Sequence, residues 1–147
     1  MKKQIGGLFI VLVLLLTACA GKGDISVDEV SKALQKQGLD VEEMTLDAAK
    51  KLSTSPAIAI NGKDPVPFEL SLPAADMAYR EFLLLYVFAS EEERIRIEKE
   101  DGTPAPIKIG ELHANVIKKK NLIAVYWSHN KDNPLLMKQV EKAMDKL

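Results

Sequence analysis

The chemistry that can be assigned with least ambiguity lies at the single cysteine, Cys19, which follows an apolar run near the N-terminus. A basic N-terminus precedes an uninterrupted apolar stretch at 8–16, and the small residues Thr17 and Ala18 come directly before the cysteine. A positive start, a short apolar run and a small-residue exit are the marks of a secretory signal peptide. We therefore expect residues 1–18 to be removed and Cys19 to begin the mature chain.

The tetrapeptide Leu16-Thr17-Ala18-Cys19 resembles the lipobox of bacterial lipoproteins. In that family the cysteine thiol receives a diacylglyceryl group and the signal is cut in front of it. The resemblance implies lipid attachment at Cys19 and a location on the outer face of the cell membrane. Two acyl chains exceed the marginal membrane affinity of one chain, so such an anchor would be effectively permanent.

Two alternatives to a lipid anchor stay open. A transmembrane helix needs about 20 apolar residues, and the apolar stretch 5–20 is shorter and runs into the polar segment 21–24. A plain secreted protein could carry Cys19 at this place by chance, although no other cysteine occurs in the chain. Export without a second cysteine leaves no intramolecular disulfide, so the exported domain depends on its core.

No second group of residues has the spacing of a catalytic or metal site. The two histidines, His113 and His129, have no cysteine or paired carboxylate near them in sequence, as a metal site would require. The carboxylate clusters at 42–43, 91–93 and 98–101 fit helix starts and solvated faces better than a calcium site or an acid and base pair. Glycine-rich phosphate loops and Gly-x-Ser-x-Gly elbows are absent from the sequence. We expect no metal, no cofactor and no catalytic residue.

The aromatic residues allow two interpretations. They could line a ligand groove, because apolar and aromatic walls are typical of binding pockets. Core packing is the interpretation we favour. The residues concerned are Tyr79, Phe82, Tyr86, Phe88, Tyr126 and Trp127.

Charge and length limit the class of protein. The full chain of 147 residues has a formal net charge of −1, and removal of the signal takes away two lysines. Nucleic-acid binding requires a clustered basic surface, and the one basic run, 118–120, suits a solvated hairpin turn. We expect a lipidated N-terminus and short tether at 19–25, followed by a single domain at 26–147. The stretch 20–25 can span only about 20 Å when extended, so the domain would lie close to the bilayer.

Helices are predicted where capping signals precede apolar residues at helical spacing. A capping box at 26–29 opens a helix that Gly38 ends. A second capping box at 90–93 opens a short helix in which Ile95 is the clearest candidate for burial. Proline in the first turn, at 133–134, predicts the start of an amphipathic last helix.

Strands are predicted where apolar residues alternate with polar ones. The segments 39–44 and 57–60 fit short strands, the latter ending at an Asn-Gly pair suited to a tight turn. The segment 66–72 alternates with prolines, which donate no ladder hydrogen bond, so we expect it at a sheet edge. The segment 82–89 is apolar at both parities and is expected at the centre of the sheet.

The segment 112–127 predicts a hairpin with its turn at Lys119-Lys120. In this register His113 pairs with Tyr126 on one face of the sheet. The opposite face is an apolar surface on which Trp127 packs beneath the last helix. Its three cross-strand pairs are Val116 with Ile123, Ala114 with Val125, and Leu112 with Trp127.

With a short helical turn at 45–54, the order of elements predicts an α+β fold, a mainly antiparallel sheet with helices packed on one face. The segments 36–42, 84–94 and 119–127 resemble small surface lipoproteins of Bacillus-type bacteria in pattern and order. That resemblance implies no site residue other than Cys19. We expect a non-enzymatic lipoprotein whose domain binds an envelope protein or a small ligand, with no nucleic-acid partner. The alternative is a hydrolase or other enzyme that acts on cell-wall or lipid substrates through dispersed carboxylates.

Overall fold

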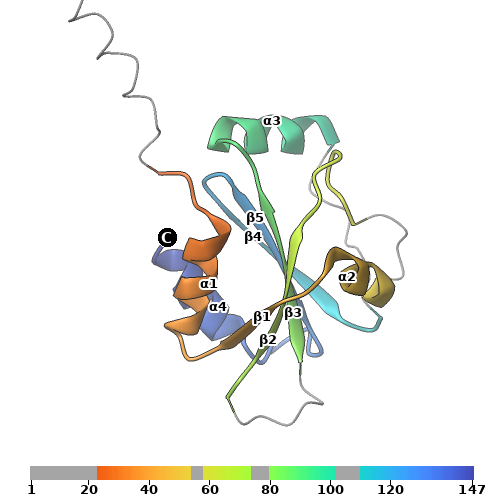
Figure 1. Ribbon diagram of the computed structural model, residues 1–147, viewed down its shortest axis with the longest axis vertical. Helices are drawn as coiled ribbons and strands as arrows, with labels where there is room; N and C mark the ends of the chain where they lie inside the picture. The colour runs from red at the N-terminus through yellow and green to blue at the C-terminus, as the bar shows by residue number, and fades with distance from the viewer. Residues whose placement is uncertain (1–22, 54–57, 74–79, 102–109) are drawn as a thin grey trace, which may run out of the picture.

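The computed structural model describes residues 23–53, 58–73, 80–101 and 110–147. The predictions that concern the signal peptide, Cys19, Ala57 and Tyr79 fall outside these ranges. The described residues form the helices and strands drawn in Figure 1, which are α1 (Val27–Gln35), β1 (Asp40–Glu43), α2 (Leu46–Leu52), β2 (Val66–Ser71), β3 (Glu81–Val87), α3 (Glu91–Asp101), β4 (His113–Lys119), β5 (Leu122–Ser128) and α4 (Met137–Asp145).

The strands make one five-stranded sheet in the order β1-β2-β3-β5-β4, and every neighbouring pair is antiparallel. The sheet with its four helices confirms the α+β fold. β3 lies in the middle of the sheet, as its apolar residues at both parities predicted. Both of its faces are covered, which explains why successive residues of the strand are apolar.

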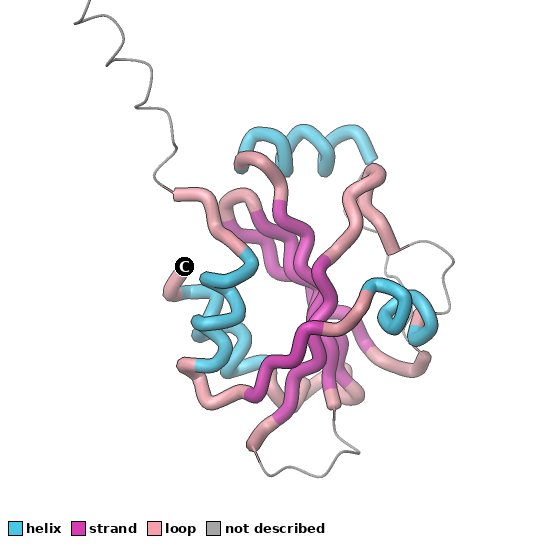
Figure 2. Tube along the Cα trace, viewed as in Figure 1, coloured by secondary structure: helices cyan, strands magenta, loops and turns pink. Residues whose placement is uncertain are grey.

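Successive residues of β3 point to opposite faces of the sheet and enter two separate cores. Leu83 and Leu85 pack with residues of α1 and α4, whereas Leu84 and Tyr86 pack on the other face with Ile97 of α3. Figures 1 and 2 show α1 and α4 side by side on one face, with α3 lying across one end of the sheet. The expectation of helices on one face therefore holds for α1 and α4, while α3 serves the second core.

The buried residue of α3 differs from the prediction. Ile95 is 37 % exposed, and Ile97 is the apolar residue that is buried. Arg94 is buried one position before Ile95. Its guanidinium donates from Nε to the carbonyl oxygen of Lys120 and pairs with Glu98 at 2.7 Å. Arg94 thereby orients α3 against the β4–β5 turn, a contact that apolar spacing does not reveal.

The prediction that the proline-containing strand lies at an edge is wrong, because β2 pairs with both β1 and β3. The carbonyl oxygen of Pro67 accepts a hydrogen bond from Met44 N at 2.9 Å, so the backbone polar groups of Pro67 face β1. β1 ends at Glu43, opposite Phe68. The donor that proline lacks therefore faces Met44, the first residue after β1, so the ladder between the two strands ends at this position.

The β4–β5 hairpin forms, but its turn lies one residue later than predicted. Lys119 pairs with Leu122, and Lys120 takes a positive φ of 47° in the turn. The observed register pairs Val116 with Val125, Ala114 with Trp127 and His113 with Ser128. The same residues still share a face, because each partner changes by two positions and side chains alternate with a period of two.

The placement of Trp127 beneath the last helix is also wrong. Trp127 packs in the core that contains Ile97, on the face opposite α4. Tyr126 occupies the α4 side, where its hydroxyl accepts a hydrogen bond from Leu136 N at 3.0 Å. The alternating pattern indicates which residues share a face of the sheet, but it does not indicate which face α4 covers.

The helix ends show how local and distant signals differ. The capping box of α1 is present, with Ser26 Oγ accepting from Glu29 N and the Glu29 carboxylate accepting from Ser26 N. The last helix begins at Met137, later than the 133–134 signal predicted, and Leu136 at its N-cap has no side-chain cap. The buried carboxylate of Glu81 on β3 instead accepts the Leu136 amide at 3.2 Å.

The basic run 118–120 is not a freely solvated turn. Lys119 Nζ donates to the carbonyl oxygen of Met144 at 2.6 Å, and Lys120 Nζ donates to that of Leu147 at 2.8 Å. Cations at the last carbonyls of a helix complement its dipole. Lys118 pairs with Glu98 at 2.7 Å. These lysines join the hairpin to α4 and α3.

Candidate functional site

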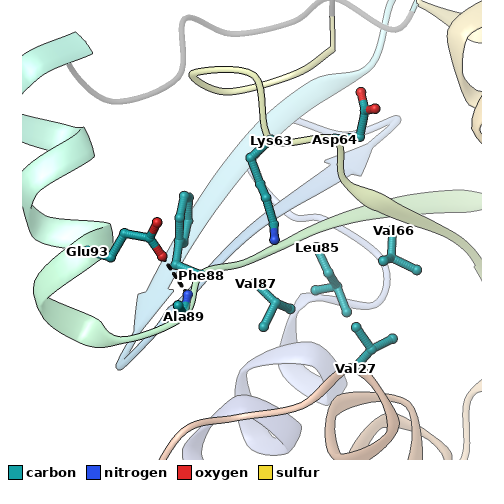
Figure 3. Close-up of a pocket in the computed structure, with 9 residues that line it drawn as sticks. All are labelled: Val27, Lys63, Asp64, Val66, Leu85, Val87, Phe88, Ala89 and Glu93. Atoms are coloured by element: carbon teal, nitrogen blue, oxygen red, sulfur yellow. Dashed lines mark hydrogen bonds between the residues drawn. The ribbon is translucent and has the colours of Figure 1, made fainter.

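An open pocket of about 520 Å³ lies at the end of the sheet near the start of α1 and of α3. In the described parts of the chain its wall is made by apolar side chains together with one cation and two carboxylates. The lining residues are Val27, Lys63, Asp64, Val66, Leu85, Val87, Phe88, Ala89 and Glu93, labelled in Figure 3.

The pocket forms where the sheet loses its outermost strand. β1 pairs with β2 only from Phe68 onward, so Val66 lies beyond the end of β1. Val66 and Val87 are half-buried, and Leu85 is fully buried beneath them. Val27, in the first turn of α1, contributes a further half-buried apolar wall. The shortness of β1 thus leaves apolar surface uncovered at this end of the domain.

The cation of the pocket is carried by a tight turn. Asn61 and Gly62 both have positive φ, 46° and 74°, as the Asn-Gly pair predicted. Ile60 and Lys63 exchange two backbone hydrogen bonds across this turn, at 3.0 and 2.8 Å. The strand predicted at 57–60 is reduced, within the described residues, to this single bridge. The turn fixes the backbone from which the Lys63 side chain leaves.

A buried tyrosine holds the same loop to the sheet. The hydroxyl of Tyr86 donates to the carbonyl oxygen of Ile58 at 2.6 Å. Burial, with a smaller contribution from the negative charge of Asp64, raises the pKa of Tyr86 well above its usual value, so the hydroxyl stays protonated and able to donate. Tyr86 is therefore a positioning residue for the turn that carries Lys63.

The side chains in the pocket are arranged as Figure 3 shows. The Lys63 ammonium extends toward the valines of the floor, while the Asp64 carboxylate points away from them. The Glu93 carboxylate accepts the backbone N–H of Ala89 at 2.6 Å. Among the described residues, none forms a hydrogen bond or an ion pair with the Lys63 side chain.

The N-terminal segment is fastened next to this pocket. Ile25 is buried, and its N–H donates to Asn121 Oδ1 at 2.7 Å. Asn121 Nδ2 donates to the carbonyl oxygens of Ile25 at 3.1 Å and of Phe88 at 3.0 Å. One buried amide thus joins the beginning of the domain, the end of β3 and the β4–β5 turn. Val27 of the pocket lies two residues after Ile25.

The residues considered for catalysis or metal binding are not brought together. His113 and His129 are both exposed, and His129 Nε2 lies 3.1 Å from the carbonyl oxygen of Arg80. No group of three histidine, cysteine or acidic residues suited to a metal ion occurs within the residues that the structure describes. Within those same ranges, no helix has the length and apolar character needed to span a bilayer.

Glu42 and Glu43 are exposed on β1, whereas acidic residues of α3 take structural roles. Glu91 and Glu98 pair with Arg94, and Glu100 pairs with Arg96. Hydrogen bonds with backbone and Ser90 hydroxyl groups at the start of α3 hold the pKa of Glu92 below its usual range.

The described aromatic residues are core residues, and one of them also lines the open pocket. Tyr86, Phe88, Tyr126 and Trp127 are buried, and Phe82 is partly buried against the second core. Phe88 alone among them lines the pocket. The interpretation that we favoured from the sequence, core packing, is confirmed for Phe82, Tyr86, Tyr126 and Trp127, whereas Phe88 both packs in the core and lines the pocket.

Sequence reasoning missed three polar residues that the structure makes prominent. Asn121 and Glu81 are buried through contacts with residues 96 and 55 positions away, and no local pattern announces such contacts. Lys63 follows the Asn61-Gly62 pair directly. The position next to a tight turn was the one signal that could have drawn attention to it.

The chain was compared with protein-family models, curated proteins and solved structures. No family model, no curated protein and no solved structure matches this chain.

Proposed function

We propose that this chain is a bacterial lipoprotein, anchored through Cys19 to the outer face of the cell membrane, whose α+β domain binds a small ligand close to the bilayer. The lipobox-like Leu16-Thr17-Ala18-Cys19 and the signal-peptide pattern before it support the anchor. The resemblance to small Bacillus-type surface lipoproteins supports the same location.

The observation that best supports a binding role is that the tether ends next to the pocket. Ile25 is held at the end of the sheet by Asn121, and Val27 is already part of the pocket wall. The stretch 20–25 reaches at most about 20 Å from Cys19. A lipid at Cys19 would therefore keep the pocket near the membrane surface, where ligands in or on the bilayer are concentrated.

The pocket has the general character of a ligand site. Its volume lies within the range of about 300–1,000 Å³ that small-molecule pockets occupy, and its lining is apolar with a few polar groups. The hydrolase alternative would need an acid and a base converging on the pocket. The described lining has two carboxylates, of which Glu93 is bonded to Ala89 and Asp64 points away, and it includes no histidine. We therefore propose binding rather than catalysis.

The anchor is tested by replacing its attachment atom. Cells that express the wild-type chain or Cys19→Ser are grown with labelled palmitate, and membrane and released fractions are compared. We expect label and membrane association only in the wild type. Label that persists in Cys19→Ser, or a wild type that takes up no label, would contradict the anchor.

A further inference from the structure

The pocket combines apolar walls with a single cation that the fold aims inward. Val27, Val66 and Val87 present half-buried apolar surface, and the Lys63 ammonium extends over it (Figure 3). An ammonium is strongly hydrated, and one placed beside an apolar surface is best satisfied by an anion that also brings apolar groups with it.

The acidic residues of the lining leave this cation available. Glu93 is engaged with the Ala89 amide, and the Asp64 carboxylate points away from the floor. In the described part of the chain, no hydrogen bond or ion pair occupies the Lys63 ammonium. The turn at Asn61-Gly62 and the Tyr86 bond to Ile58 restrict the backbone that bears it, so part of the ordering cost of binding is already met by the fold.

We propose that the pocket binds an anionic single-chain amphiphile, an acyl chain that ends in a carboxylate or a phosphate ester. Lys63 pairs with the anionic group, and the valines contact the first methylenes of the chain. The rest of the chain leaves through the open side of the pocket. This inference rests on the proposed binding function and names its ligand class.

A simpler role for Lys63 is to cover the valines with its own methylenes while the ammonium stays in water. This role and the proposed one differ in what they predict for charge. If Lys63 only covers the valines, ligands with charged and uncharged headgroups should bind equally well. If Lys63 binds an anion, a ligand with a carboxylate or phosphate should bind better than an alcohol with the same chain.

Photocrosslinking of the full chain in the membranes of expressing cells separates the two roles. The probes are dodecanoate, dodecyl phosphate and dodecanol, each carrying a diazirine on the chain. After irradiation and trypsin digestion, mass spectrometry gives the labelled fraction of the peptide 81–94, which contains Leu85, Val87 and Phe88. The peptide 132–138, from the loop after β5 and the start of α4, is the internal reference.

We expect both anionic probes to label peptide 81–94 about fivefold more than the alcohol, the factor that a partly exposed ion pair supplies at the upper end of its range. Lys63→Met should lower the labelling of peptide 81–94 by the anionic probes to the level reached by the alcohol. Lys63→Arg should retain most of the difference in labelling between the anionic probes and the alcohol. Lys50→Met, an exposed lysine of α2 outside the lining, is the matched control and should change nothing. Unlabelled dodecanoate should compete with both anionic probes, and inorganic phosphate should not.

Each other outcome overturns a defined part of the proposal. Equal labelling by all three probes, or no effect of Lys63→Met, would overturn the anion preference while leaving a binding pocket near the membrane in place. Competition by inorganic phosphate alone would show that the acyl chain is not recognised. Labelling of 81–94 no greater than that of 132–138 with every probe would remove both the ligand class and the proposed binding function.

Discussion

Replacing Asn121 with alanine tests whether one buried amide holds the beginning of the domain to the sheet. Asn121 is 2 % exposed and makes three side-chain hydrogen bonds, two with Ile25 and one with Phe88. A hydrogen bond contributes about 1 kcal/mol net, and each backbone group left buried without a partner adds to the cost. We expect Asn121→Ala to lower the free energy of unfolding by about 3 kcal/mol.

Urea denaturation followed through Trp127, the only tryptophan and 1 % exposed, measures this loss. Asn115→Ala is the matched control, because Asn115 lies on the same hairpin, is half-buried, and its Nδ2 has no partner among the described residues. That variant should lose less than about 1 kcal/mol. Asn121→Asp should be no more stable than Asn121→Ala, since a carboxylate oxygen would face the Ile25 and Phe88 carbonyl oxygens. An Asn121→Ala midpoint within error of wild type would refute the reasoning.

Further predictions concern the two cores and the first helix. Trp127→Ala should cost about 3–5 kcal/mol in urea denaturation followed by circular dichroism, as a large deletion in the core opposite α4, and a loss below about 1 kcal/mol would contradict that placement. Leu84→Asp and Leu85→Asp should each prevent cooperative thermal unfolding, because the two residues are buried on opposite faces and an unpaired charge is costly in either core, so a wild-type melting curve for one of them would show its face to be open. Hydrogen bonds from the Ser26 backbone and then its hydroxyl lower the pKa of Glu29. The ionised Glu29 therefore stabilises the folded domain fully above the usual carboxyl pKa of 4.5, and this contribution to the free energy of unfolding is lost as the pH falls through the lowered value. Glu29→Gln should remove this dependence, and parallel acid titrations of the two proteins would contradict it.

Much of the fold could be predicted because its signals are local. The Ser26–Glu29 capping box, the Asn61-Gly62 turn and the central β3 are each encoded within a few consecutive residues. The hairpin shows the limit of such reasoning. A turn at Lys119-Lys120 and one at the next position give the same alternation of faces, so the pattern cannot distinguish the two registers.

The wrong predictions concern features of the fold that depend on contacts between residues far apart in the sequence. Nothing near Trp127 indicates which sheet face α4 covers, and the start of α4 depends on Glu81 from another strand. The pocket depends on the early end of β1 relative to β2 and on the direction of Lys63. Both are properties of the assembled sheet, so no motif in the sequence could have placed a binding site there.

The account depends most on the claim that Cys19 anchors the pocket end of the domain against the membrane. Because lipid would occupy the only natural thiol, a cysteine introduced elsewhere can be labelled alone. Asp64→Cys places a fluorophore at the pocket, and Asp132→Cys places one in the loop after β5. β5 begins next to Asn121, at the pocket end of the sheet, and runs to the other end. Its length places the two ends roughly 20 Å apart.

Quenching of these two labels by nitroxide-bearing lipid headgroups, with the lipidated protein in vesicles, is the direct measurement. The account predicts stronger quenching of the label at position 64 than of the label at position 132, and loss of quenching at both positions in the Cys19→Ser background when the added thiol is labelled there. Equal quenching at the two positions, or stronger quenching at position 132, would contradict it.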